Sequence, residues 1–500
     1  MASNPLTTAA SDKTHGYVTE ITYPFNYYRE LNPNTHALAL TASGIAGRAL
    51  GAPMVYIELG CGLGLSTLVH AAANPQAQFF GLDLNPDHIN VARDIAATAG
   101  LANVTFLELA FEDMEAAGLP QFDTIAMHGV WSWINQFNRD VILRFIDRHL
   151  TTGGVVYSSY NAQPGYSAIM PLRELMMIGY RQADGSIADK VSAGLAFGQR
   201  IKSLNATYFR ANPLLGQYLD DIMPLSPNYL AHEYFNADWW SFHFSQIVAQ
   251  HEPLGLTFGG SARLLDHIDA LNFTPGMREA LGEITDSTAR ETLKDFFLNC
   301  QFRRDLFVRD ATRLSNPKAM LMDVAMAAAV LPANVHRVAG TTMLGEIRPQ
   351  ADAALAVATA LAEGPASTNA LMKHPAAAGM EPDAVLEAVL TMAALGAAEP
   401  AMPASGLPAR KVRTDRLNTV LWERSLTRDE VHATASPVTG GAVGLPRMEQ
   451  LFLLARHRGV DATDLVVSAM PGENRTEVNA AYEAFVAARI PLLRNLGIGN

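Results

Sequence analysis

The sequence VYIELGCGLG at residues 55–64 decides the fold. Its first five residues form a short apolar run that predicts a strand, and a helix is predicted from Ser66 to Ala73. The glycines between them let the backbone turn sharply and approach a ligand without a Cβ clash. The N-terminus of the following helix offers free N–H groups. This stretch therefore predicts a strand, a ligand-binding loop and a helix.

The alternation of strand and helix continues to Ser159. Asp83 ends the second predicted strand about 20 residues after the glycines, the position of the ribose-binding acid in dinucleotide-type folds. Strands separated by helices of this length predict a doubly wound, Rossmann-like α/β fold with a parallel sheet. After the first strand, further strands are expected at residues 78–83, 104–108, 122–127 and 155–159, with helices at 86–98 and 139–150.

The order of residues in the glycine loop separates two classes of cofactor. Dinucleotide sites use G-x-G-x-x-G, because a pyrophosphate lies on the helix N-terminus. Here the pattern is E-x-G-x-G-x-G, and the carboxylate of Glu58 would repel a pyrophosphate. It suits a cofactor with a cationic sulfonium and an ammonium group. The pattern therefore favours S-adenosylmethionine, with S-adenosylhomocysteine as product, over NAD; the alternative is an ordinary tight turn.

Residues 58–64 together with Asp83 resemble the class I methyltransferases. Two further stretches, HGVWSW at 128–133 and YSSYNAQPGY at 157–166, resemble a narrower group. These are bacterial methyltransferases with a regulatory domain, similar to the rickettsial outer-membrane-protein lysine methyltransferases. The class resemblance covers about residues 17–260, and the narrower one runs to about Arg309. The motifs YPF at 23–25, HEY at 232–234 and FRR at 302–304 also resemble the narrower group.

The resemblance implies roles at the cofactor site. Gly60 and Gly62 would contact the amino-acid part of the cofactor through their backbone, and Glu58 would balance its charge. Asp83 would accept hydrogen bonds from the ribose hydroxyls, and Leu84 would pack on the adenine.

The adenine side departs from the class pattern. Where the class often has an acidic residue after the third strand, this chain has Ala110, so adenine recognition falls to Phe111 and Glu112. His128 ends the fourth strand, where such enzymes line the methyl-donor site. The cofactor-binding residues expected are Tyr27, Glu58, Gly60, Cys61, Gly62, Asp83, Leu84, Phe111, Glu112 and His128.

Residues after the fourth and fifth strands are candidates for the acceptor site, because open α/β sheets bind ligands at this edge. Trp131 and Trp133 would form an aromatic wall around an amine through cation–π contact, or else belong to the core. Tyr160 and Asn161 would orient an acceptor, or else form a turn. The catalytic residues expected are His128, Trp131, Tyr160 and Asn161.

The need for a base depends on the acceptor. Burial lowers the pKa of a lysine from its reference of about 10.4, so an amine requires no dedicated base. A hydroxyl acceptor requires one, and His128 or His232 would then serve.

Composition excludes several classes of protein. The 500 residues carry a net charge of −12, with 49% hydrophobic and 17% charged residues, so we expect packed cores and no nucleic-acid binding. Two cysteines are too few for a disulfide framework or a Cys-rich zinc site, and no metal is expected. The N-terminus, Met1–His15, lacks an apolar signal segment, and the longest apolar stretch, Ala319–Ala333, is too short to span a bilayer. We therefore expect a cytoplasmic protein without membrane insertion.

The domain organisation is less regular after Ser159. Strands at 229–235 and 256–259 are expected to complete the sheet, which makes the helical residues from Pro171 to Pro227 an insertion; a separate helical domain is the alternative. A helix is expected at 278–309. The domains expected are 1–265 for the methyltransferase domain (lid 15–45, insertion 171–228), 266–345 for a helical middle region and 346–500 for a mainly helical C-terminal domain.

The C-terminal third has a winged-helix-like pattern. Three short helices, at 351–362, 367–372 and 382–395, precede strands expected at 398–402 and 411–420. The basic cluster Arg410–Arg416 lies where a wing would be, but a solvated hairpin or a protein contact suits this acidic chain better than DNA binding.

Three functions follow from these patterns. The first is N-methylation of lysine side chains in a protein, which favours a protein or peptide partner over a small molecule and leaves a homodimer open. The second is methylation of a small molecule or peptide natural product on nitrogen or oxygen, with the helical insertion as a lid. The third is a non-catalytic module that binds the cofactor as a sensor.

Overall fold

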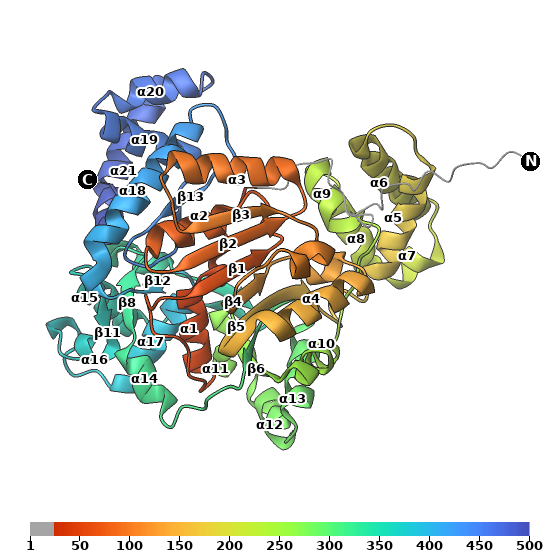
Figure 1. Ribbon diagram of the computed structural model, residues 1–500, viewed down its shortest axis with the longest axis horizontal. Helices are drawn as coiled ribbons and strands as arrows, with labels where there is room; N and C mark the ends of the chain where they lie inside the picture. Colours follow the sequence, from red (N-terminus) through yellow and green to blue (C-terminus); the bar gives the residue numbers. More distant parts are fainter. Residues whose placement is uncertain (1–24, 500) are drawn as a thin grey trace, which may run out of the picture.

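A seven-stranded sheet forms the centre of the computed structural model, which describes residues 25–499 (Figure 1). The strand order is β3-β2-β1-β4-β5-β7-β6. The first five strands pair in parallel, and β7 pairs antiparallel with both β5 and β6. The expected doubly wound, Rossmann-like α/β fold is therefore confirmed. Its strands are β1 (Val55–Leu59), β2 (Gln78–Asp83), β3 (Val104–Glu108), β4 (Phe122–Met127), β5 (Leu150–Asn161), β6 (Leu256–Ser261) and β7 (Phe302–Arg309).

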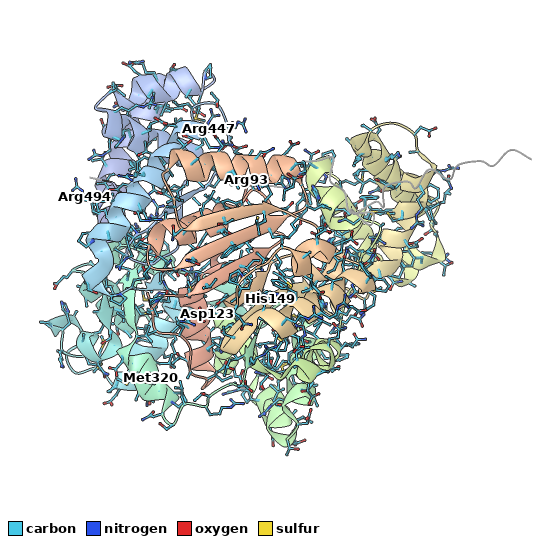
Figure 2. All side chains as sticks on the ribbon, in the orientation of Figure 1. Arg93, Asp123, His149, Met320, Arg447 and Arg494 are labelled. Carbon is cyan, nitrogen blue, oxygen red and sulfur yellow. The ribbon has the colours of Figure 1, made fainter. Side chains whose placement is uncertain are left out.

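Helices cover both faces of the sheet, and side chains fill the space between the layers (Figure 2). One face, which carries Tyr56 and Tyr157, packs on α1 and on the helices that follow β1 and β2. The other, which carries Ile57 and Val156, packs on the helices that precede β5 and β6. The first group is α1 (Pro33–Ala42), α2 (Leu65–Ala73) and α3 (Pro86–Thr98), and the second is α4 (Gln136–His149) and α10 (Phe244–His251).

Five of the six α-helices between β5 and β6 in the sequence share one apolar core. Because β6 belongs to the same sheet as β5, these helices form an insertion between two of its strands. Residues 229–235 are not the expected strand: Pro227 begins a helix, and Leu230, Ala231 and Tyr234 are buried at helical spacing. The helices are α5 (Met170–Gln182), α6 (Ile187–Ser203), α7 (Thr207–Ala211), α8 (Pro213–Ile222) and α9 (Pro227–Tyr234).

The seventh strand corrects the helix expected at 278–309. Helices α11 (Asp269–Asn272), α12 (Pro275–Glu283) and α13 (Ser287–Leu298) are followed by β7, which extends the sheet beyond residue 265, the predicted end of the first domain. The strand was not predicted because Arg303 and Asp305 are charged. In the structure they form an ion pair at 2.8 Å, which lets both of them be buried.

The C-terminal third contains part of the expected winged-helix-like pattern. The three expected helices (α15, α16 and α17) and the expected strand β12 are present. This strand belongs to a small sheet of order β11-β8-β12, whose middle strand precedes the three helices in the sequence. The elements from residue 317 to residue 400 are α14 (Pro317–Asp323), β8 (Ala325–Ala328), β9 (Gly340–Thr342), β10 (Gly345–Ile347), α15 (Ala351–Leu361), β11 (Ala366–Ser367), α16 (Thr368–Leu371), α17 (Pro382–Ala394) and β12 (Ala398–Pro400).

The strand expected at 411–420 is wrong, because these residues lie in α18 (Leu407–Arg424). The basic cluster is therefore no wing. Arg410 is buried and donates to the carbonyls of Pro403 and Pro437, and Arg413 donates to the Asn103 side chain of the methyltransferase fold. The chain ends with β13 (Ala433–Ala435), β14 (Ala442–Gly444), α19 (Arg447–Arg458), α20 (Ala462–Ala469) and α21 (Arg475–Asn495). Within residues 25–499, every helix is too short or too polar to cross a bilayer.

Candidate cofactor and acceptor site

The glycine loop connects β1 to α2 at the carboxyl end of the parallel strands. Gly60, Gly62 and Gly64 have φ angles of 72°, 55° and 75°, in the left-handed region that favours glycine. A Cβ on Gly60 would lie 2.7 Å from Cγ2 of Val130, so a larger residue would displace the loop or Val130. The amides of Gly60 and Cys61 donate to the Leu82 carbonyl at 2.7 and 2.9 Å, which fixes the loop against β2.

Asp83 joins this loop to the end of β2. Its carboxylate accepts hydrogen bonds from the amides of Gly62 and Asn85, both at 2.9 Å, and lies 3.3 Å from Nδ1 of His88. The side chain is only 16% exposed. The acid therefore lies beside the glycines, as expected from the sequence.

The surroundings of Glu58 show which cofactor charge would fit beside the glycine loop. The side chain is buried, 4% exposed, and accepts a hydrogen bond from Thr67. Burial, and to a smaller degree the charge of Asp83, raises the pKa of Glu58 to about 8, although the Thr67 bond lowers it. A cation nearby would favour the charged form, whereas a pyrophosphate would oppose it. The residues present therefore fit a sulfonium and ammonium group.

The residues expected at the adenine lie along the same edge of the sheet. Asp83 and Glu108 are register partners on β2 and β3, so the segments that follow both strands are neighbours. Leu84, Phe111 and Glu112 occupy these segments and are half-buried. Cys61 differs, because its thiol packs in the core beside Gly81 and leaves only its backbone to the loop.

An aromatic stack closes one side of the glycine-loop cavity. Tyr28 stacks on His128 with ring centroids 3.9 Å apart, and its amide donates to Ser66 on α2 at 3.2 Å. Nδ1 of His128 lies 2.8 Å from the Tyr157 hydroxyl. Burial, with a contribution from Arg304, lowers the pKa of His128 to about 3. His128 is therefore neutral and a weak base at physiological pH.

The cavity between these groups is small. Its volume is about 30 Å³, and its lining includes Tyr28, Glu58, the loop glycines and His128. Small-molecule sites usually measure roughly 300–1,000 Å³, so this cavity is smaller than a cofactor site. Tyr27 does not line this cavity: it packs edge-on against His70 and faces Glu399 of the C-terminal third. The lid residues before Phe25 lie outside the described residues.

Comparisons with known proteins identify the family. Residues 50–186 match the family model described as a methyltransferase domain, and residues 226–309 match the predicted methyltransferase regulatory domain. An uncharacterized protein of Synechocystis sp. is 36% identical over 97% of this chain and 99% of its own length. The chain belongs to the S-adenosylmethionine-dependent methyltransferases with a regulatory domain.

Solved structures share the architecture of this methyltransferase. PKMT2 from Rickettsia typhi in complex with AdoHcy superposes with a TM-score of 0.70 at 18% identity, covering 95% of this chain and 99% of that one. An uncharacterized protein of Rickettsia prowazekii is 26% identical over 60% of this chain and 54% of its own length. The likeness to PKMT2 shows a common fold over nearly the whole of both chains.

The methyltransferase buries most of the expected acceptor residues. Trp131 is 0% exposed and packs in the core behind β1, β4 and β5. Tyr160 is also 0% exposed, and its hydroxyl donates to Asp305 on the face opposite Tyr157. Trp133 packs against Tyr166 at the base of the helical insertion. None of these three side chains therefore lines the cavity beside the glycine loop.

Asn161 differs from its neighbours. Its side-chain amide is buried and has no hydrogen-bond partner within residues 25–499. It is the register partner of Phe302, whose ring contacts His128 edge-on. Asn161 therefore ends β5 on the His128 side of the sheet with free hydrogen-bonding capacity.

Sequence reasoning missed Glu233. This half-buried carboxylate on α9 accepts a hydrogen bond from the Tyr166 hydroxyl at 3.0 Å, and burial raises its pKa to about 7. Burial and the charges of Glu233, Tyr218 and Tyr28 raise the pKa of Tyr229 to about 12, so these four groups act on one another electrostatically. Glu233 belongs to the motif HEY at 232–234, in which only His232 was considered as a candidate base. Across residues 25–499, no three His, Cys, Asp or Glu side chains are arranged to hold a metal.

Proposed function

We propose that this methyltransferase transfers a methyl group to lysine side chains of a protein. The observation that carries the proposal is the Glu233 carboxylate, which accepts a hydrogen bond from Tyr166 and acts electrostatically on Tyr229, as Tyr28 of the aromatic stack also does. A buried carboxylate among tyrosine rings suits an alkylammonium group, by ion pairing and by cation–π contact. A neutral acceptor would gain only a hydrogen bond from this carboxylate, without the ion pair.

The titration of these groups also favours an amine. A lysine must lose a proton before its nitrogen can attack, and a base acts best when its pKa lies near the working pH. His128, with a pKa of about 3, is too weak for a hydroxyl acceptor. Glu233, with a pKa of about 7, would accept the ammonium proton, while Asn161 would orient the amine.

The cofactor roles follow the geometry of the loop. We propose that Glu58 balances the sulfonium and ammonium charge, that Gly60 and Gly62 bind through their backbone, and that Asp83 holds the ribose. When bound, S-adenosylmethionine supplies an activated methyl group. The chain contributes orientation in near-attack geometry and exclusion of water, with Tyr28 covering the site.

The fold neighbour gives further support. PKMT2 from Rickettsia typhi was solved in complex with AdoHcy. We extend AdoHcy binding to this chain as part of the proposal, together with a cytoplasmic location, a protein partner and a homodimer as the oligomeric state to test.

The test measures methyl transfer from labelled S-adenosylmethionine to lysate proteins and, separately, to the small-molecule fraction of the same lysate. We expect label in proteins, on lysine by peptide mass spectrometry. Glu233→Gln keeps the hydrogen bond to Tyr166 but should lower kcat at least tenfold and remove the rise of activity near pH 7. Glu174→Gln, an exposed carboxylate on α5 of the same insertion, should leave the rate unchanged.

Two results would contradict the proposal. Label confined to the small-molecule fraction would support a natural-product methyltransferase. Cofactor that binds but never turns over with either fraction would support a non-catalytic sensor. An unchanged pH profile in Glu233→Gln would remove the role of that residue while leaving the acceptor class to the mass spectrum.

A further inference from the structure

A second, larger cavity lies at the edge of the sheet formed by β6 and β7. Its volume is about 1090 Å³, at the upper end for small-molecule sites, and its walls come from these strands and from α11–α13. It shares no lining residue with the cavity beside the glycine loop. Most of its wall falls in the segment 226–309 that matches the regulatory domain.

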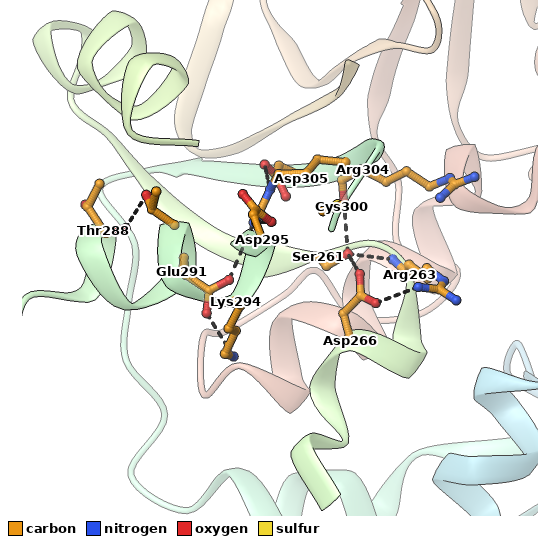
Figure 3. Close-up of polar contacts among 12 residues, drawn as sticks. Ser261, Arg263, Asp266, Thr288, Glu291, Lys294, Asp295, Cys300, Arg304 and Asp305 are labelled. Carbon is orange, nitrogen blue, oxygen red and sulfur yellow. Dashed lines mark hydrogen bonds and ion pairs between the residues drawn. The ribbon is translucent and has the colours of Figure 1, made fainter. Parts of the chain in front are cut away.

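Arg303 is the central charge of this cavity. Its guanidinium donates to Asp295 at 2.7 Å and to Asp305 at 2.8 Å, and lies 3.5 Å from Glu291, which also pairs with Lys294 at 2.9 Å. Figure 3 shows the α13 side chains of this network and, to their side, a second group in which Asp266 binds Ser261 and Arg263.

Two carboxylate oxygens in this network are left without hydrogen-bond partners in the described part of the chain. They are Oδ2 of Asp295 and Oδ1 of Asp305, on residues that are 2% and 0% exposed. The other oxygen of Asp305 already accepts from Arg303 and from Tyr160. Buried polar atoms normally have a partner, so both oxygens point to a missing hydrogen-bond donor.

The charges of the network specify the donor. Four carboxylates (Asp269, Glu291, Asp295 and Asp305) pair with two cations (Lys294 and Arg303), which leaves two negative charges in excess. A neutral donor would leave this excess unchanged, whereas a cation would reduce it. These acids do not form a metal-binding group within residues 25–499. An organic cation therefore fits better than a metal ion.

We propose that this cavity is a second ligand site, which binds an alkylammonium or guanidinium group between Asp295 and Asp305. The cation would donate to both free oxygens and complete the network around Arg303. The same group could come from a free polyamine or from a lysine or arginine side chain of a peptide. The site is separate from the methyl-transfer site and does not depend on the acceptor proposed above.

Calorimetric titration of the full chain tests the site. The probes are spermidine, butylamine and a lysine-containing peptide, each beside its fully N-acetylated form, in which every amine is an uncharged amide. We expect saturable binding of the charged probes only. Binding by the peptide alone would assign the source as a protein, and binding by the free amines would assign a small molecule.

Three variants locate the binding. Asp295→Asn should weaken binding at least tenfold, and Glu279→Gln, an exposed carboxylate on α12, should leave it unchanged. Gly282→Phe adds bulk at the cavity wall, where a Cβ would meet no neighbouring atom within 4 Å, and keeps every charge, so it tests the site even if Asp295→Asn fails to fold. Retained AdoHcy binding reports the fold. The absence of saturable binding, or equal binding by wild type and a folded Asp295→Asn or Gly282→Phe variant, would overturn the proposal.

Discussion

Replacing Glu58 with glutamine should stabilise the cofactor-free protein more as the pH rises. In the unfolded chain this carboxyl ionises near its ordinary pKa of 4.5, but in the fold its pKa is about 8. Between these values, folding must keep the group protonated, which costs about 1.4 kcal/mol per pH unit. The resulting penalty grows by about 3 kcal/mol from pH 5 to pH 8. Glutamine still accepts the Thr67 hydrogen bond and has no charge, so it escapes the penalty.

Urea unfolding at several pH values, followed by tryptophan fluorescence, measures this difference. The free energy of unfolding of Glu58→Gln minus that of wild type should rise by about 3 kcal/mol across the range, as estimated from linkage. Glu387→Gln, an exposed carboxylate on α17, should run parallel to wild type. In calorimetry, Glu58→Gln should bind S-adenosylmethionine more weakly than wild type, because the positive charge of the cofactor no longer meets a carboxylate. Parallel stability curves for Glu58→Gln and wild type would refute the burial argument.

Three further changes test the site and its support. Gly60→Ala places a Cβ 2.7 Å from Val130 and should weaken AdoHcy binding at least tenfold by calorimetry; unchanged affinity would show that the loop relaxes freely. Tyr28→Ala removes the ring stacked on His128 and should speed AdoHcy entry and release in stopped-flow measurements, whereas equal rates would mean that Tyr28 is no lid. Leu421→Ala empties a fully buried position and should lower stability by about 3 kcal/mol in chemical unfolding; a loss well under 1 kcal/mol would disprove tight packing of α18 on α2.

The cofactor half of the site was predictable because its signals are local. The apolar run at β1, the glycines and Asp83 are close in sequence. The apolar run predicts a buried strand, the glycines predict a left-handed turn, and Asp83 places a carboxylate at a strand end. Glu58 also indicated the class of cofactor, because an acid before the glycines would repel a pyrophosphate. Local pattern therefore sufficed for the sheet up to β5 and for the cofactor.

The acceptor half was not predictable in the same way, because its residues meet only through tertiary contacts. Tyr160 appeared to face a ligand until its partner Asp305, on β7, was known. The strand β7 was itself concealed by charges that are neutralised within the fold. Glu233 became a candidate only when α9 replaced the expected strand and brought it to Tyr166. Periodicity cannot reveal a partner that is 67 or 145 residues away.

The C-terminal third packs against the candidate cofactor site. Leu417 and Leu421 of α18 share a core with α2, the helix that begins at the glycine loop. The same third holds the segment that covers the site, since Arg29 forms an ion pair with Glu399 at 2.7 Å and Asn34 donates to the Thr439 carbonyl at 2.8 Å. Both the loop and its cover are therefore anchored from outside the methyltransferase sheet, so packing changes in α18 should alter cofactor affinity without touching a cofactor-binding residue.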